Sequence, residues 1–399
     1  MATCSARTRK HLTAFAVTLV AIIAIRSMAC HALRPPAEAV MRDEDRSDVL
    51  SRRDYLVARV AEDFAGAMAA PDQDFFRGEW ALGTLSMTSA ALCNIAFAWP
   101  DTRAQAVQQL PPILDKALLP STRAFDTSQW GTDALDTLGS DQGHLGYLGH
   151  LNLMLGCYRV LGGDHRYDAL HDRITEAMVR RMNRSPSAHV ETYPGEIYTS
   201  DNATAAASIA VHALASGEDH GPELRRFVQY TRSHLLDART GLVVFKVGAQ
   251  GQPLGTPRGC GVGWNSFYLP FVDRTFASEQ WARLRDHMVR RSPIGLWGVR
   301  EYPAGAWGLG DVDSGPIVLG LSPSATGFAL AGARREADVE TLGRLMLTAE
   351  LAGTTWVGLE GTRYLAAPLV GDAIVLAMRT ARDWDGRYVS GEGRRATGR

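Results

Sequence analysis

Two kinds of helical segment alternate along this chain, and their alternation limits the fold more than any other feature of the sequence. The first kind is amphipathic, with apolar residues at spacings of three and four, as in the series Leu170, Ile174, Met178 and Met182. The second kind is rich in Ala, Gly, Ser and Leu on nearly all sides, so other parts of the protein must cover it. The amphipathic segments lie near residues 50–68, 101–118, 165–184, 220–237, 278–291 and 338–352, and the apolar segments near 79–98, 143–161, 203–216, 261–273, 314–333 and 362–381.

This order predicts an all-α fold of six helical hairpins, with an outer ring of helices packed on an inner ring, which is an (α/α)6 toroid. An open helical solenoid is the alternative, but the unequal lengths of the repeats and loops favour a closed ring. A small β-hairpin is predicted within the fourth long loop, where residues 242–247 precede a turn at residues 248–251.

The lengths of the loops indicate which end of the predicted ring carries the functional site. Connections from an inner to the next outer helix are short, as at Trp99 and Pro100, whereas those from outer to inner helices are long. All the long loops then lie at the end where the inner helices begin. The free N–H groups and positive dipole ends of these helices would surround one funnel, where a functional site is expected.

Residues 193–202 carry the first pair of candidate catalytic acids, Glu196 and Asp201, just before an apolar helix. A polar loop at the mouth of a helix suggests a reaction site. The alternative is that Asp201 or Ser200 only caps the helix, since a short side-chain oxygen can accept the free N–H groups.

Asp311 and Asp313 form the second pair of candidate catalytic acids. Alternate residues of an extended segment point the same way, so the two carboxyl groups could lie side by side and raise the pKa of one of them. A carboxylic acid that stays protonated near neutrality can act as a general acid. The alternative is that Asp313 or Ser314 caps the fifth inner helix, with Pro316 in its first turn.

Aromatic and polar side chains near the long loops complete the predicted site as substrate-binding residues. His144 and His150 are six residues apart, too far around a helix to share a metal, and a core role for either histidine is the alternative. No metal and no cofactor are predicted. The predicted binding residues are Trp80, His144, Tyr147, His150, Tyr193, Tyr198, Asn202, Trp264, Asn265 and Tyr364.

Charge and cysteine content narrow the class of partner. The formal net charge is -1, and no long basic run appears outside the extreme ends, so a nucleic-acid partner is not expected. The five cysteines have no paired short spacing, which leaves a zinc site of the Cys-x-x-Cys kind unsupported. Cys260 lies at the predicted funnel, but no histidine close in sequence could serve as its base, so it is not predicted to be the nucleophile.

The N-terminus has the pattern of an export signal, with Arg7, Arg9 and Lys10 before an apolar run at residues 12–25. Residues 1–34 are therefore predicted to be a signal peptide, with an uncleaved membrane anchor or a lipid on Cys30 as alternatives. Residues 35–49 are predicted to be a solvated tether, residues 50–385 the catalytic toroid and residues 386–399 a flexible tail. The predicted location is periplasmic or extracellular.

Two segments resemble a known enzyme family. Residues 147–158, Tyr-Leu-Gly-His-Leu-Asn-Leu-Met-Leu-Gly-Cys-Tyr, and residues 193–202, Tyr-Pro-Gly-Glu-Ile-Tyr-Thr-Ser-Asp-Asn, are similar to segments of the bacterial linalool dehydratase/isomerase family. The resemblance implies an active-site histidine at His150. The two active-site cysteines of that family fall on Thr192 and Asp201, so this chain lacks both. As a whole, residues 50–385 resemble the (α/α)6 toroids of glycoside hydrolases and polysaccharide lyases.

Three functions follow from these features. The first is an exported glycoside hydrolase, in which two carboxyl groups act as acid and base and Trp80, Trp264 and Tyr364 bind sugar faces. The second is a hydro-lyase or isomerase of the linalool type, acting on a small alcohol with Glu196, Asp201 and tyrosines. The third is a glycan-binding protein without catalysis. The substrate is expected to be a carbohydrate or another small molecule.

Overall fold

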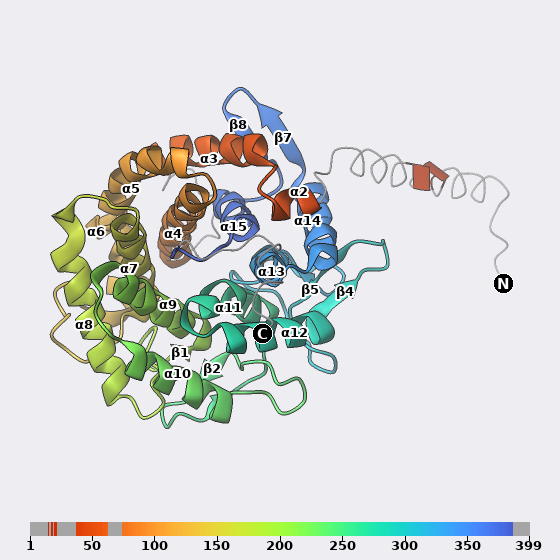
Figure 1. The fold of residues 1–399 in the computed structure, drawn as a ribbon. Helices are drawn as coiled ribbons and strands as arrows, with labels where there is room; N and C mark the ends of the chain where they lie inside the picture. Colours follow the sequence, from red (N-terminus) through yellow and green to blue (C-terminus); the bar gives the residue numbers. More distant parts are fainter. Residues whose placement is uncertain (1–14, 16, 19, 22–36, 63–73, 386–399) are drawn as a thin grey trace, which may run out of the picture.

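The computed structural model describes residues 37–62 and 74–385, together with positions 15, 17, 18, 20 and 21 (Figure 1). Two concentric rings of helices form the described part of the chain. The inner ring consists of α4 (Asp74–Ala98), α7 (Leu145–Val160), α9 (Thr199–Ser216), α11 (Gly259–Val272), α13 (Pro323–Arg335) and α15 (Leu369–Arg379). The outer ring consists of α3 (Arg46–Ala61), α5 (Arg103–Ala117), α8 (Asp168–Arg184), α10 (Gly221–His234), α12 (Arg274–Met288) and α14 (Val339–Gly353).

The inner ring is closed, because each inner helix packs against the next and α15 packs against α4. This arrangement explains why the inner helices are apolar on nearly all sides. Among the described residues, one helical segment, Phe76–Ala98, is long and apolar enough to cross a membrane, and it is mostly buried within the protein. The predicted (α/α)6 architecture is therefore confirmed.

The outer helices bury only one face. In α8 the stripe formed by Ile174, Met178 and Met182 is buried, while Arg173 and Glu176 are exposed. Short 3-10 turns, η1 (Pro100–Thr102) and η2 (His165–Tyr167), connect inner to outer helices, as the short predicted connections require.

Two inner helices begin later than the sequence predicts. The alternative interpretation of Asp313 or Ser314 as a helix cap is wrong: α13 begins at Pro323, and the hydroxyl of Ser322 accepts a hydrogen bond from the N–H of Ala325. The last inner helix is preceded by the hairpin of β7 (Thr355–Gly358) and β8 (Gly361–Tyr364), so its predicted start at residue 362 is also wrong. The second long loop contains a further helix, α6 (Pro120–Trp130).

Small antiparallel sheets stiffen the long loops. The predicted hairpin is confirmed, since β2 (Lys246–Val247) pairs with β3 (Pro253–Leu254), with Val247 opposite Pro253. The same β2 pairs on its other edge with β1 (Ile197–Tyr198), which leads directly into α9. A second sheet joins β4 (Val289–Arg291), β5 (Trp297–Arg300) and β6 (Leu321–Ser322).

Residues 37–49 are not the solvated tether that the sequence predicts. They form α2 (Ala37–Met41) and the start of α3, and Val40 is fully buried. Arginines of the last inner helices account for this difference: Arg379 forms ion pairs with Asp45 and Asp48 at 2.6 and 2.7 Å. The predicted leader lies almost wholly outside the described residues, and the predicted tail of residues 386–399 lies outside them.

Candidate active site

A cavity of about 820 Å³ opens where the inner helices begin. Each of the six inner helices contributes residues from its N-terminal half, for example Trp80 from α4, His150 from α7 and Trp264 from α11. The long loops supply the rest of the lining. The cavity is therefore the funnel that the loop lengths predict.

Glu79 is an acid of the cavity wall that was not among the predicted catalytic residues. The hydroxyl of Tyr193 donates a 2.7 Å hydrogen bond to its Oε1. Burial raises the pKa of Glu79 to about 8, and the negative charges of Asp313 and Asp201 act in the same direction. Glu79 therefore holds a proton at neutral pH.

Asp201 also lines the cavity, from the first turn of α9. Its Oδ2 accepts a 2.9 Å hydrogen bond from the hydroxyl of Thr192. Burial raises its pKa to about 7, and the charge of Asp313 contributes to the rise. Because Tyr198 is the N-cap residue of α9 and no side chain caps that end, the interpretation of Asp201 or Ser200 as a helix cap is wrong.

Asp313 and Asp311 have different environments although they are two residues apart. Asp313 faces the cavity, and burial together with the charge of Asp311 raises its pKa to about 6. Its side chain remains exposed to the open volume of the cavity, so water reaches it more easily than it reaches Asp201. Of the three cavity acids with a raised pKa, Glu79, Asp201 and Asp313, Asp313 therefore ionises first.

Asp311 binds a guanidinium instead of facing the cavity. Arg258 holds its two oxygens at 2.5 and 2.9 Å, and also donates to Glu301 at 2.7 Å. Burial works against ionisation of Asp311, but the hydrogen bonds from Arg258 and Ser314 bring its pKa below the ordinary value. Asp311 is thus a fixed anion that joins the fourth and fifth long loops.

Glu196 lines the cavity as an ion-paired carboxylate. Its oxygens accept hydrogen bonds from Lys246 at 3.0 Å and from the hydroxyl of Tyr198 at 2.8 Å. Although burial works against ionisation, these two donors bring its pKa below the ordinary value. The pairing of β1 with β2 places Lys246 opposite Tyr198, which explains why the three side chains meet.

Cys260 lies in the first turn of α11 and lines the cavity. Its thiol donates a 3.1 Å hydrogen bond to the buried Glu301. Burial and the charge of Glu301 raise the pKa of this thiol well above its ordinary value, so the reactive thiolate is disfavoured. This environment supports the prediction that Cys260 is not a nucleophile.

His150 and Trp264 lie next to each other in the cavity lining. Nδ1 of His150 lies 2.8 Å from the hydroxyl of Ser86, and the imidazole packs edge-on against Trp264. Burial lowers the pKa of His150 to about 4, so the ring is neutral. The indole N–H of Trp264 donates to Thr204 at 2.7 Å, which fixes the orientation of the ring.

The structure brings most of the predicted site residues to one cavity. The predicted residues that line it are Trp80, His150, Tyr193, Glu196, Tyr198, Asp201, Trp264, Asp313 and Tyr364. The predicted residues outside its lining are His144, Tyr147, Asn202, Asn265 and Asp311.

The four outlying residues other than Asp311 are buried in the scaffold. Nδ1 of His144 lies 2.6 Å from a carboxylate oxygen of Asp126, and the hydroxyl of Tyr147 donates to a backbone carbonyl of α5. Asn202 holds the backbone of Val190 through two hydrogen bonds. Asn265 lies inside α11, with its side-chain oxygen unpaired among the described residues.

Apolar side chains form much of the remaining wall. They come chiefly from the fifth long loop, from α13 and from α15. They include Phe76, Leu82, Phe245, Ile294, Leu296, Val312, Val318, Leu319, Leu321, Phe328, Val370, Ile374 and Val375. The acids therefore share the cavity lining with a larger number of apolar side chains.

The fold is similar to that of two solved structures of glycoside hydrolases. One is described as a C. acetobutylicum ATCC 824 glycoside hydrolase from family 105, with 13% identity, a TM-score of 0.48, and coverage of 82% of this chain and 98% of that one. The other is an unsaturated glucuronyl hydrolase specific for heparin, with 13% identity, a TM-score of 0.50, and coverage of 84% and 96%. At this identity the second likeness supports the fold alone. No protein-family model matches the chain.

Proposed function

We propose that this chain is an enzyme that breaks a C–O bond by carboxyl acid/base catalysis, and that it is a glycoside hydrolase. The observation that carries the proposal is the presence of Glu79, Asp201 and Asp313 on one cavity with a raised pKa for each. Groups that hold protons near neutral pH are what such a reaction requires.

Asp201 and Asp313 are assigned as the acid and the base. Asp313 ionises first, and its negative charge then raises the pKa of Asp201. Asp201 can donate its proton to the oxygen of the leaving group while Asp313 accepts a proton from water. Glu79 is a second proton donor on the same wall, and the ion-paired Glu196 positions Tyr198 and Lys246.

A hydro-lyase or isomerase acting on a small alcohol is the second candidate, and the apolar lining favours it. A sugar needs many polar partners, whereas a terpene-like alcohol needs an apolar wall such as that formed by Phe328, Val370 and Ile374. The resemblance of residues 147–158 and 193–202 to the linalool dehydratase/isomerase family supports the same candidate. The chemistry would again use Asp201 to protonate the departing oxygen.

Product analysis in ¹⁸O-labelled water separates these functions. The full chain would be incubated with a panel of glycosides and a panel of apolar alcohols, and the products identified by mass spectrometry. A hydrolase incorporates one solvent oxygen into a sugar product, whereas a hydro-lyase releases water and forms a carbon–carbon double bond. Binding without turnover of any glycan, measured by calorimetry, would instead support the glycan-binding alternative.

We also propose that the protein is exported and acts in the periplasm or outside the cell. The support is the basic start and apolar run of residues 1–34. Retention of this segment as a membrane anchor is the alternative.

A further inference from the structure

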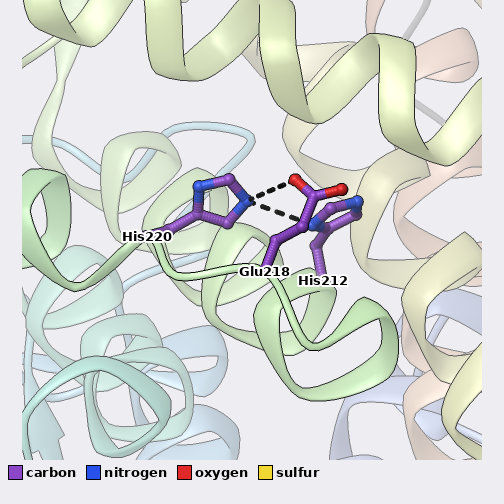
Figure 2. Close-up of side chains that lie close together, drawn as sticks. All are labelled: His212, Glu218 and His220. Atoms are coloured by element: carbon purple, nitrogen blue, oxygen red, sulfur yellow. Dashed lines mark hydrogen bonds and ion pairs between the residues drawn. The ribbon is translucent and has the colours of Figure 1, made fainter.

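Three side chains of metal-binding type meet at the end of α9 that is remote from the cavity (Figure 2). His212 lies in the last turns of α9, Glu218 on the following loop, and His220 at the N-cap of α10. Gly217 ends α9 with a φ of 82°, a left-handed conformation that turns the chain back toward His212. One ligand atom from each side chain lies within 4.8 Å of those of the other two.

The separations of these atoms fit a small tetrahedral cation. Nδ1 of His212 lies 3.1 Å from Nε2 of His220, which lies 3.8 Å from Oε2 of Glu218. Ligands about 2.0–2.1 Å from a zinc ion are about 3.3 Å apart at the tetrahedral angle. The two observed spacings, 3.1 and 3.8 Å, lie on either side of this value. Small side-chain rotations would therefore bring the three ligand atoms to zinc-binding distances.

A carboxylate that contacts the other ring nitrogen of His212 is a second, independent indication of metal binding. Nε2 of His212 lies 2.9 Å from Oδ1 of Asp172, and Arg159 holds the same oxygen at 2.5 Å. An N–H at Nε2 donating to Asp172 leaves a lone pair on Nδ1, which lies 3.1 Å from His220 and 3.4 Å from the hydroxyl of Ser216. Metal-binding histidines typically donate their other ring N–H to such a carboxylate.

We propose that His212, Glu218 and His220 bind a divalent cation of the zinc type, with water as the fourth ligand. The ion joins the C-terminal end of α9 to the start of α10 and stabilises this hairpin of the ring. His212 follows Asp201 by eleven positions on the same helix, about 16 Å along its axis, so the ion does not touch the substrate. Glu218 is exposed, which gives the cation a route of entry.

Zinc retention by the untagged full chain tests the proposal. The protein would be stripped with EDTA, equilibrated with Zn²⁺ and passed through gel filtration, and its metal content measured by mass spectrometry. The wild type is expected to retain one zinc per chain and to melt at a higher temperature with zinc than without it. The variants His220→Gln and Glu218→Gln are expected to lose at least tenfold in affinity and most of the thermal shift.

His165→Gln is the matched control. His165 is an exposed histidine that contacts Asp168 at 2.8 Å, and it also lies where an inner helix connects to an outer one. This variant should retain zinc like the wild type. Absence of zinc from the wild type would overturn the proposal, and so would equal retention by the wild type, His220→Gln and Glu218→Gln, which would indicate adventitious binding.

Discussion

The hydroxyl of Tyr193 donates a 2.7 Å hydrogen bond to Glu79, a residue 114 positions earlier in the chain. The bond stabilises the ionised form of Glu79 and so opposes the effect of burial on its pKa. The donor comes from the third long loop and the acceptor from α4, so the proton affinity of Glu79 depends on a contact between two segments that are distant in sequence.

Replacement of Tyr193 by Phe is expected to raise the pKa of Glu79 further. If turnover requires protonated Glu79, the alkaline limb of the pH–rate profile then moves to higher pH. Tyr167→Phe is the control, because it removes a similar 2.6 Å hydrogen bond to Asp115 between outer-ring elements. A profile in Tyr193→Phe that coincides with that of Tyr167→Phe would exclude Glu79 as the titrating acid.

The variants Asp201→Asn and Asp313→Asn are expected to fold normally and to lose turnover by about a hundredfold or more, the usual contribution of a general acid or base. Asn keeps the shape of Asp and can still accept the hydrogen bond from Thr192 at position 201. Asp141→Asn is the matched control, since Asp141 is exposed and pairs with Arg184 away from the cavity. Near-normal turnover in either cavity variant would remove that residue from the mechanism.

The stability of Asp201→Asn should exceed that of the wild type at alkaline pH. Asp201 has a pKa of about 7 in the folded protein, against an ordinary value of 3.8. Between these values the unfolded chain loses the proton while the folded chain keeps it, so the stability of the wild type falls as pH rises. Above pH 7 the full cost is up to about 4 kcal/mol, less where cavity water solvates the carboxylate. Urea unfolding at pH 4 and pH 8 would measure it, and equal differences at both values would contradict it.

Cys260→Ala is expected to keep most of the activity. The thiol is protonated and donates to Glu301, so the substitution removes one weak hydrogen bond and no nucleophile. Turnover before and after treatment with a thiol reagent would be compared in the wild type and the variant. Inactivation of the wild type alone, with protection by substrate, would show that Cys260 takes part in the reaction.

The first 34 residues are expected to export a reporter fused to residue 49. Alkaline phosphatase, which is active only in an oxidising compartment, would report the location. A matched fusion with Arg7, Arg9 and Lys10 replaced by Glu should show reduced activity. An inactive wild-type fusion that accumulates to normal levels would argue against export.

The two rings could be predicted because the inner helices are apolar on nearly all sides and must be buried by neighbouring helices. An apolar surface on nearly all sides, as in residues 203–216, is stable only between neighbours, so periodicity alone separates the inner from the outer helices. The start of α13 could not be predicted in the same way. Ser314 to Pro316 and Ser322 to Pro323 offer similar cap-and-proline signals, and only packing selects the second.

The cavity acids were predictable only in part. Asp201 stands out because a polar loop precedes an apolar helix there, and Asp313 because a second acid, Asp311, lies two positions away. In the sequence, Glu79 cannot be distinguished from any other acid in the first turns of a helix. Its hydrogen-bond partner in the cavity, Tyr193, is distant in sequence. A place at the start of an inner helix also does not say which way a side chain points: Asn202 lies in the first turn of α9 and faces the backbone of Val190.

The docking of residues 37–49 on the last inner helices sets an order of events during synthesis. Asp48 pairs with Arg379, which is 331 positions later, and α4 receives its second inner-ring neighbour only when α15 arrives. At about 5–20 residues per second the ribosome needs roughly 20–60 s to make the intervening chain. During that interval the face of α4 that packs against α15 lacks this partner. The cavity therefore forms late, when the last inner helix closes the ring on the first.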